Sequence, residues 1–414
     1  MDAGACVAGA HPAWAPLVAA APRWHVIAVG KAAAPMLRAC LAGAPAPPAT
    51  ALLVAPAADS SLPATVEQLI GGHPVPTDGS VAAGERALEI ARGAGHDDVL
   101  LVLLSGGASA LMAAPVAGVT LADTRATTAR LLREGADIHE LNTVRKHLSR
   151  VKGGRLAAAG AARILCLAIS DVLDDDVSVI GSGPTVGDLS TCADALAVVD
   201  RRGGRGAFPD AVVAWLERGA ASQEPPTAGW PALRRADTRV IANRSRALAG
   251  ARVEAARRGY DVVVETDPVA GEARVAAVEY ACRLRAHAAV RSRACCVLSG
   301  GETTVRVTGG GRGGRNQEFA LALAGPLAAM TRPTVLVSLG TDGVDGPTDA
   351  AGAIADVTTI ARAAQLGGPG LQACLDANDS YTFFDPLGDL IRTGPTSTNV
   401  GDLQVAVVAA KDAR

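Results

Sequence analysis

The chain has 414 residues, of which 49% are hydrophobic and 19% charged, a size and composition typical of a packed protein with two domains. The formal net charge is −2 and aromatic residues make up only 3% of the chain, which excludes the basic surface and stacking platforms of a typical nucleic-acid-binding protein. No apolar stretch reaches the ~20 residues needed to span a membrane, so we expect neither a nucleic-acid nor a membrane partner.

Cysteine usage and the N-terminal segment both predict a cytoplasmic protein. The eight cysteines form no C-x-x-C pair, and several, such as Cys166 and Cys295, lie in apolar runs that resemble buried strands. Free thiols of this kind are typical of a reducing compartment. The first residues lack a basic segment followed by an apolar core, so they do not predict a secretory signal.

Apolar runs alternate with helical stretches along the chain. Each run ends in glycine or a polar cluster, and the runs cover residues 24–30, 99–104, 162–170, 239–243, 260–266, 295–301, 334–340 and 404–410. Continuous apolar strands that alternate with helices predict a parallel sheet covered on both faces. A Pro- and Gly-rich stretch without periodicity, residues 219–238, predicts a linker and divides the chain into domains 1–230 and 231–414.

The first polar turn is VGKAAA, residues 29–34, which places Lys31 at the start of a helix. It is not a Walker A loop, because no glycine stands five residues before Gly30 and Ala32 replaces the metal-binding Ser or Thr. A lysine at a helix N-terminus opposes the helix dipole, and a bound anion would resolve that conflict. The alternative is a solvated lysine.

A second turn, SGGAS at residues 105–109, joins a buried strand to a helix. Glycines there let backbone N–H groups point into the loop, and the helix N-terminus adds partial positive charge, so Ser105, Gly106, Gly107 and Ser109 are candidate phosphate ligands. The alternative is a tight turn capped by serine.

The segment 140–157 is unusually polar. It contains a Gly-Gly pair, Gly153 and Gly154, and the polar residues around it are Asn142, Arg145, Lys146, Arg150, Lys152 and Arg155. Only four of the 39 basic residues of the chain are lysines, and Lys31, Lys146 and Lys152 all lie in such polar stretches. The segment is either a solvated basic helix or a cationic wall for a phosphate chain or an acidic substrate.

Two acidic turns follow strands. Asp171 comes directly after the run 162–170, with three further aspartates at 174–176, and a carboxylate in that place can hold Mg²⁺ or accept a hydroxyl proton. Asp342 begins the turn TDGVDGPTDAAGA, whose spacing does not match a calcium-binding EF-hand. For at least two of the four acids at 171 and 174–176, the alternative is a place in a surface turn without a functional role.

Residues 308–321 read TGGGRGGRNQEFAL. Gly309, Gly311 and Gly314 match G-x-G-x-x-G, but the preceding segment is polar and the next acid at a strand end, Asp342, is too distant for a dinucleotide fingerprint. The other interpretation is a loop that brings Arg312 or Arg315 to a charged centre, as phosphoryl transfer requires.

Together these segments resemble the glycerate 2-kinase family, whose C-terminal half carries the MOFRL domain. The resemblance runs in order from residue 29 to 403 and rests on VGKAAAPM, GGHPVPTDGS, LLSGGASALM, ELNTVRKHLSRVKGGRLA, ISDV with GSGPTVGD, LSGGETTVRVTGGGRGGRNQEFALALA, TDGVDGPTDAAGA and TGPTSTNVGDL. It implies two α/β domains, a Rossmann-like parallel sheet followed by a smaller domain with a mixed sheet, and an active site in the cleft between them. The implied reaction is ATP- and Mg²⁺-dependent phosphorylation of the 2-hydroxyl of D-glycerate by a monomer or homodimer.

The family's catalytic lysine and arginine correspond to Lys31 and Arg315. Residue type and strand-end position add Asp171 as the group that orients or deprotonates the acceptor hydroxyl. The remaining expected roles are phosphate binding for Ser105, Gly106, Gly107, Ser109, Lys152 and Gly153, substrate binding for Asn142, Arg145 and Asn316, and metal binding for Asp171 and Asp342.

Three alternatives remain open at the level of sequence. The chain has Leu-Asp-Asp-Asp-Val at 173–177, beside Asp171, where the family has a Pro-Gly turn. This difference leaves open that the protein is a kinase whose acceptor is another small hydroxy acid. A nicotinamide-dependent hydroxypyruvate reductase would use the G-x-G-x-x-G match. A sugar-acid binding protein without catalytic activity would not need so many cations and acids.

Overall fold

The computed structural model describes residues 2–222 and 227–411. Contacts divide the described residues into two compact units, the N-terminal unit (2–242) and the C-terminal unit (243–411). Residues 223–226 of the expected linker lie outside the described residues.

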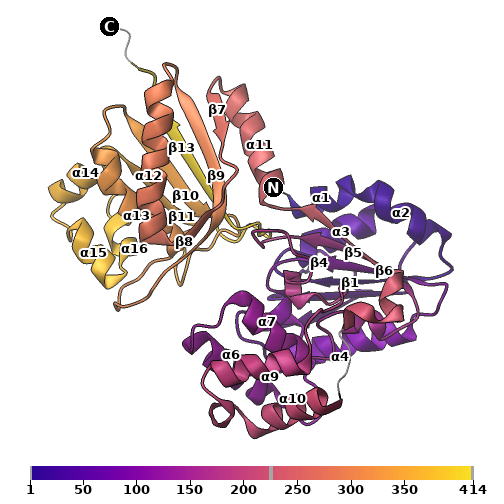
Figure 1. Ribbon diagram of the computed structural model, residues 1–414. Helices are drawn as coiled ribbons and strands as arrows, with labels where there is room; N and C mark the ends of the chain where they lie inside the picture. The colour runs from indigo at the N-terminus through magenta and orange to yellow at the C-terminus, as the bar shows by residue number, and fades with distance from the viewer. Residues whose placement is uncertain (1, 223–226, 412–414) are drawn as a thin grey trace. The chain divides into compact units, whose positions relative to one another are not determined.

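The N-terminal unit contains a six-stranded parallel sheet (Figure 1). Its strands are β1 Trp24–Val29, β2 Thr50–Ala55, β3 Val66–Ile70, β4 Val99–Leu104, β5 Arg163–Ile169 and β6 Ala236–Ala242. Their order, β3-β2-β1-β4-β5-β6, is that of the Rossmann fold, as expected. Because β6 pairs with β5, this sheet extends beyond the domain boundary expected at residue 230.

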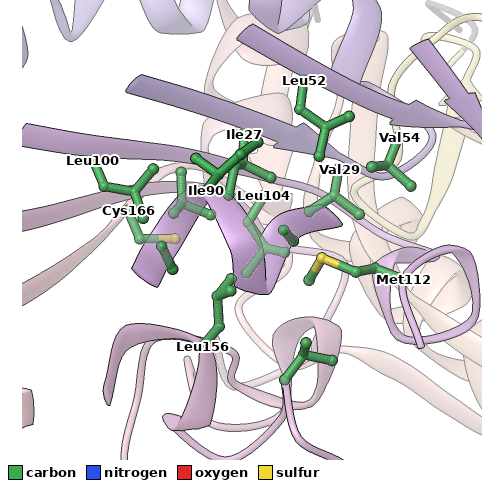
Figure 2. Packing of buried hydrophobic residues seen from close by; sticks show 14 of the residues in the cluster. Ile27, Val29, Leu52, Val54, Ile90, Leu100, Leu104, Met112, Leu156 and Cys166 are labelled. Atoms are coloured by element: carbon green, nitrogen blue, oxygen red, sulfur yellow. The ribbon is translucent and has the colours of Figure 1, made fainter. Parts of the chain in front are cut away.

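Helices cover both faces of this sheet, which explains why every residue of β1 and β4 is buried. The helices are α1 Ala3–Gly9, α2 His11–Ala20, α3 Ala33–Gly43, α4 Asp78–Gly93, α5 Ala108–Leu111, α6 Leu121–Arg133, α7 Ile138–His147, α8 Arg155–Ala158, α9 Cys192–Arg201 and α10 Asp210–Ser222. Figure 2 shows one side of the sheet, where Ile27, Leu52 and Leu100 meet Ile90 of α4 and Leu156 of α8 in a single core.

Helices α6, α7, α9 and α10 form a separate cluster beside the sheet, with a core of their own (Figure 1). Three of them begin at a capping box, in which Thr120, Asp137 and Thr191 exchange hydrogen bonds with the residue three positions later. These boxes satisfy the N–H groups that a helix start leaves without partners, so the local sequence fixes where each helix begins.

The C-terminal unit contains a mixed seven-stranded sheet, as expected. Its strands are β7 Asp261–Val264, β8 Val269–Glu272, β9 Cys295–Thr304, β10 Thr334–Gly340, β11 Gly352–Asp356, β12 Leu390–Ile391 and β13 Asp402–Val408. Strand β9 pairs in parallel with β7 and β8 and antiparallel with β13, while β10 pairs antiparallel with β11 and β13.

The helices of the C-terminal unit lie on the two faces of its sheet. They are α11 Arg244–Arg257, α12 Ala273–Val290, α13 Arg315–Ala328, α14 Thr359–Gln365, α15 Leu371–Ala377 and α16 Ser380–Phe384. Helices α12 and α13 contribute Tyr280 and Phe319 to the main core, whereas α11 packs Leu248 against a smaller core on the other side. No helix within the described residues combines the length and apolar character that a membrane span needs.

Candidate active site

The adjacent carboxyl ends of β1 and β4 bring Lys31 next to the loop 105–107. Strand order reverses between these two strands, and ligands of open α/β sheets bind outside the strand ends at such a point. The N–H of Lys31 donates to the carbonyl oxygen of Gly106 at 2.9 Å, and the N–H of Ala32 donates to Ser105 Oγ at 3.1 Å. The sequence-predicted residues Lys31, Ser105, Gly106 and Gly107 therefore share one site.

Gly30 permits this close approach of the two turns. Its φ is 128°, and a Cβ there would lie 2.1 Å from Ser105 Oγ. Gly107, with φ 85°, is close to Lys31 and to His73, because a Cβ on it would lie 3.4 Å from Lys31 Cγ and 3.0 Å from His73 Cδ2. Sequence reasoning did not assign His73 a role, although it lies in the segment GGHPVPTDGS that carried part of the family resemblance.

Lys152 is almost fully buried beside the same loop. Its Nζ donates to the carbonyl oxygen of Ser109 at 2.6 Å, and among the described residues no carboxylate forms an ion pair with it. Burial, reinforced by the charge of Arg145, lowers the pKa of Lys152 to about 7. Lys152 is therefore a cation that an anionic ligand would stabilise.

A chain of side-chain hydrogen bonds connects Ser109 to α7. The hydroxyls of Ser109 and Ser182 are 2.8 Å apart, and Ser182 Oγ donates to Asn142 Oδ1 at 3.0 Å. Asn142 is buried, and the N–H of Gly153 donates to the carbonyl oxygen of Ser182 at 3.0 Å. Asn142 and Gly153 thus support the site from within the fold, and neither lines the cavity described next.

The N-terminal unit contains a cavity of about 500 Å³, called the N-terminal cavity below. Gly107, Ser109, Arg145 and Lys152 line it together with residues 73–76 and parts of α6 and α7. Burial lowers the pKa of Arg145, whose Nε lies 3.5 Å from Thr128 Oγ1. The structure thereby brings four sequence-predicted residues to one cavity.

The other basic residues of segment 140–157 have different partners. Lys146 forms a buried ion pair with Asp188 at 3.2 Å, Arg150 pairs with Glu85, and Arg155 donates to the carbonyl oxygen of Lys146. The segment is therefore neither a solvated helix nor a continuous cationic wall, because only Arg145 and Lys152 of its basic residues line the cavity.

Asp171 follows β5, the strand next to β4, so it lies at the same edge of the sheet as the loop 105–107. The acids after it stabilise a turn, as one interpretation of the sequence held. Asp174 Oδ1 accepts the N–H of Asp176 at 3.2 Å, and Asp176 Oδ1 accepts the N–H of Ser178 at 2.8 Å. These two bonds replace the Pro-Gly turn of the family with Asx turns.

In the C-terminal unit, Arg315 is the first residue of α13 and is held by two carboxylates. Its Nε and Nη2 donate to Asp402 Oδ1 at 3.1 and 3.0 Å, and Nη1 donates to Glu302 Oε1 at 2.8 Å. The Asp402 side chain is fully buried, whereas that of Arg315 is 32% exposed. A two-point contact of this kind fixes the plane of the guanidinium.

Beneath Arg315, Asn316 and Asp345 complete a buried polar network. Asn316 Nδ2 donates to Asp402 Oδ1 at 2.8 Å, and Ser338 Oγ donates to Asn316 Oδ1 at 2.7 Å. Asp345 accepts the N–H groups of Asn316 and Gln317 at the start of α13. Burial raises the pKa of Asp345 to about 6. Burial also raises the pKa of Asp402, against the effect of the Arg315 charge.

Asp342, the expected metal ligand, lies in the half-buried turn after β10. Its Oδ1 accepts the N–H of Val344 at 3.1 Å. Among the described residues, no three His, Cys, Asp or Glu side chains are grouped as potential ligands of one metal ion. Sequence reasoning missed Asp345 and Asp402, since nothing in their local sequence marks which acid of a turn or strand start becomes buried.

The glycines of residues 309–314 accommodate close packing within the C-terminal unit. A Cβ on Gly309 would lie 2.2 Å from the carbonyl oxygen of Ala377, and one on Gly313 would lie 2.2 Å from Ser380 Oγ. Arg312 stacks on the ring of Tyr381 at 4.1 Å. The loop therefore lies against residues 377–381, and of its two arginines only Arg315 joins the buried network.

Comparisons with known proteins agree with this architecture. A family model described as a domain of unknown function, DUF4147, matches residues 10–217, and the MOFRL family matches residues 295–402. Glycerate 2-kinase of Pyrococcus horikoshii is 37% identical over 84% of this chain and 79% of its own. A protein of Agrobacterium vitis with the provisional name hydroxypyruvate reductase is 39% identical over 93% of this chain and 87% of its own.

A crystal structure of glycerate kinase from Thermotoga maritima matches with a TM-score of 0.83 and 35% sequence identity, covering 98% of both chains. The chain is thus an α/β protein with a DUF4147 segment followed by a MOFRL segment. It belongs to the glycerate 2-kinase family, and the resemblance seen in the sequence is confirmed.

The turn at Gly30 provides the first test. We expect Gly30→Ala to lower the free energy of unfolding of the N-terminal unit by at least about 2 kcal/mol, because a positive φ and overpacking each cost about 1–3 kcal/mol. Urea unfolding followed by tryptophan fluorescence measures this unit, since Trp14, Trp24, Trp215 and Trp230 all belong to it.

Gly93→Ala is the matched control, because a Cβ at this helix end meets no atom within 4 Å. We expect it to change the same free energy by no more than about 1 kcal/mol. Equal effects of the two substitutions would contradict the close approach of Gly30 to Ser105.

Proposed function

We propose that the protein transfers the γ-phosphoryl group of ATP to the 2-hydroxyl of D-glycerate, with Mg²⁺ as the required ion. The observation that carries this proposal is the position of Lys31, beside a glycine turn at the point where strand order reverses. The proposal is supported by relatives named glycerate kinase, which are similar over both units.

Phosphoryl transfer depends mainly on positioning and on neutralising charge, and the proposed site supplies both. The N–H groups of Gly106 and Gly107 have no acceptor among the described residues, so they are available to phosphate oxygens. Lys31 is a compact cation next to them. Arg315 is the second proposed catalytic cation, and Asp402 and Glu302 hold it in a fixed orientation.

Mg²⁺ is usually held by one or two carboxylates together with substrate phosphates and water, so it does not need a cluster of protein ligands. Asp171 fits this role through its position at the strand end, where it also fits the orientation or deprotonation of the acceptor hydroxyl. Asp342 is the second candidate, although one of its oxygens already accepts a backbone N–H. When bound, the ion would neutralise charge that develops on the phosphates.

The remaining predicted residues divide into two groups. Ser109, Arg145 and Lys152 line the N-terminal cavity and are proposed to contact substrate or nucleotide. Asn142 and Asn316 are buried with their side chains bonded to Ser182 and Asp402, so we propose that they position their neighbours instead of binding glycerate directly.

A hydroxypyruvate reductase is the competing function, suggested by the provisional name of one relative. The G-x-G-x-x-G match would be its nucleotide site. Gly309 and Gly311 pack against residues 377–379 and Gly314 packs against Asp345, so the loop backbone approaches protein atoms and does not form the tight strand-to-helix turn of a dinucleotide fingerprint. The geometry therefore favours the kinase.

The direct test is ³¹P NMR after incubation of the protein with ATP, Mg²⁺ and D-glycerate. We expect 2-phosphoglycerate, and we expect Lys31→Met and Arg315→Met each to lower kcat at least about 100-fold, as loss of one stabilising group at a charged transition state does. Lys411→Met and Arg312→Met are the matched controls, because Lys411 is exposed and Arg312 stacks on Tyr381.

NADH oxidation with hydroxypyruvate is followed in parallel. Reductase activity without any phosphorylated product would overturn the proposed function.

The hydrogen bonds that hold Arg315 predict that its carboxylate partners also affect kcat. Asp402→Asn removes the charge that fixes the guanidinium, and we expect kcat to fall by about 100-fold with little change in KM, since small misplacements of a reacting group cost this much. Glu302→Gln alters the more exposed partner and should have the smaller effect. A larger effect of Glu302→Gln would show that Asp402 does not position Arg315.

The lowered pKa of Lys152 predicts a pH dependence of nucleotide binding. Lys152 is charged below pH about 7 and loses its proton above it, so its contribution to ADP affinity should fall as pH rises through 7. The measurement is ADP affinity of wild type relative to Lys152→Met between pH 6 and 9, because the ratio removes the titration of ADP itself. A ratio that stays constant with pH would rule out this role.

A further inference from the structure

The N-terminal cavity differs in character from one part of its lining to another. Cationic and hydroxyl groups come from Ser109, Thr124, Arg125, Thr127, Thr128, Arg145, Ser149 and Lys152. Most of the remaining lining is apolar and comes from Pro74, Val75, Pro76, Ala110, Ala113, Ala114, Pro115, Leu131, Leu132, Val144 and Leu148. A ligand that fits this lining has an anionic end and a larger apolar or planar body.

The volume of the cavity is too large for glycerate alone. A cavity of about 150 Å³ accommodates benzene, and glycerate is a molecule of similar size. The N-terminal cavity measures about 500 Å³. A nucleoside has roughly three times as many non-hydrogen atoms as benzene, so a base with its ribose matches this volume by the same scale.

The charge of the cavity also requires an anion nearby. Arg125, Arg145 and Lys152 line it, and no Asp or Glu side chain is among its described lining residues. Of these three, Arg125 donates to the carbonyl oxygen of Pro76. Lys152 is 7% exposed, and its Nζ donates to the carbonyl oxygens of Ser109 and Met112. The buried ammonium of Lys152 and the half-buried guanidinium of Arg145 form no ion pair with a carboxylate among the described residues, so both are stabilised when a phosphate approaches them.

The position of the cavity connects it to the proposed phosphoryl-transfer site. Gly107 and His73 line the cavity, and a Cβ on Gly107 would lie 3.4 Å from Lys31 Cγ. A nucleotide with its base among the apolar residues can therefore extend its phosphates past Ser109 and Gly107 toward Lys31.

We propose that the N-terminal cavity binds the base and ribose of the phosphoryl donor, with Arg145 and Lys152 contacting its phosphates. This inference rests on the proposed kinase function and assigns Arg145 to the nucleotide instead of the glycerate carboxylate. Residues of α6 and α7 then determine which nucleotide the protein uses.

The test fills the cavity without touching its cations. Ala110 is a half-buried residue of α5 that lines the cavity, so Ala110→Phe would occupy the space of the base. Ala126→Phe on α6 is the matched control, because Ala126 is exposed and does not line the cavity. Calorimetric titration of the full chain measures the affinity for adenosine and for ADP, and thermal melting establishes that each variant is folded.

We expect Ala110→Phe to weaken both ligands by at least about tenfold and Ala126→Phe by less than about twofold, since an aromatic ring in the cavity excludes the base. Unchanged affinity for both ligands in folded Ala110→Phe overturns the inference. A raised KM for D-glycerate with unchanged ADP affinity also overturns it and assigns the cavity to the acceptor.

A second measurement needs no variant. Amide hydrogen exchange of the wild-type protein should slow in residues 124–132 when ADP is added, and unchanged exchange there overturns the inference. Loss of ADP binding in Ala110→Phe, in a protein that does not phosphorylate glycerate, would support the nucleotide site while the proposed acceptor fails. The two proposals are therefore tested separately.

Discussion

The parallel pairing of β1 with β4 is the constraint on which the proposed site depends. These two buried strands end side by side at the same edge of the sheet. The turns that follow them approach so closely that Gly30 has no room for a side chain next to Ser105. Because strand order reverses there, the following segments α3 and α5 diverge and leave the strand ends open. Lys31, the free N–H groups of the glycine turn and the N-terminal cavity all follow from this one arrangement.

Lys152 in the N-terminal unit and Arg315 in the C-terminal unit differ in whether a carboxylate of the protein balances their charge. Burial removes Lys152 from water without a carboxylate, which lowers its pKa to about 7 and makes its charge depend on a ligand. Arg315 keeps its charge and is held in the plane set by the buried Asp402. The choice of side chain suits each task, because an ammonium changes protonation when it is buried, whereas a guanidinium stays charged and bonds in a fixed plane. The scarcity of lysine in an arginine-rich chain marked Lys152 in the sequence, and its role in binding stays a prediction.

Sequence reasoning predicted what local patterns determine and missed what long-range packing determines. The continuous apolar runs located β1, β4 and β5 to within a residue, because strands buried on both faces consist almost entirely of apolar residues. The tripeptide Ser-Gly-Gly occurs twice, in two different structures: residues 105–107 form the turn after β4, whereas residues 299–301 remain within β9, where Gly301 lies against the neighbouring β8. Neighbouring strands decide this difference. Asp345 and Asp402 were missed for the same reason, since burial of a particular acid depends on distant segments.

Glycine-rich loops illustrate why a motif needs its structural context. At 105–107 the glycines follow a central parallel strand and leave N–H groups available, so an anion can bind. At 309–314 the glycines make room for residues 377–380, and the result is a fixed start for α13. Under the proposed function, the second loop would act on the chemistry through Arg315 and its buried carboxylate, because its glycines pack against protein atoms. The same residue type thus leaves backbone N–H groups available in one unit and makes room for close packing in the other. In the proposed phosphoryl transfer, which depends on placement and charge, these two features would serve binding and positioning.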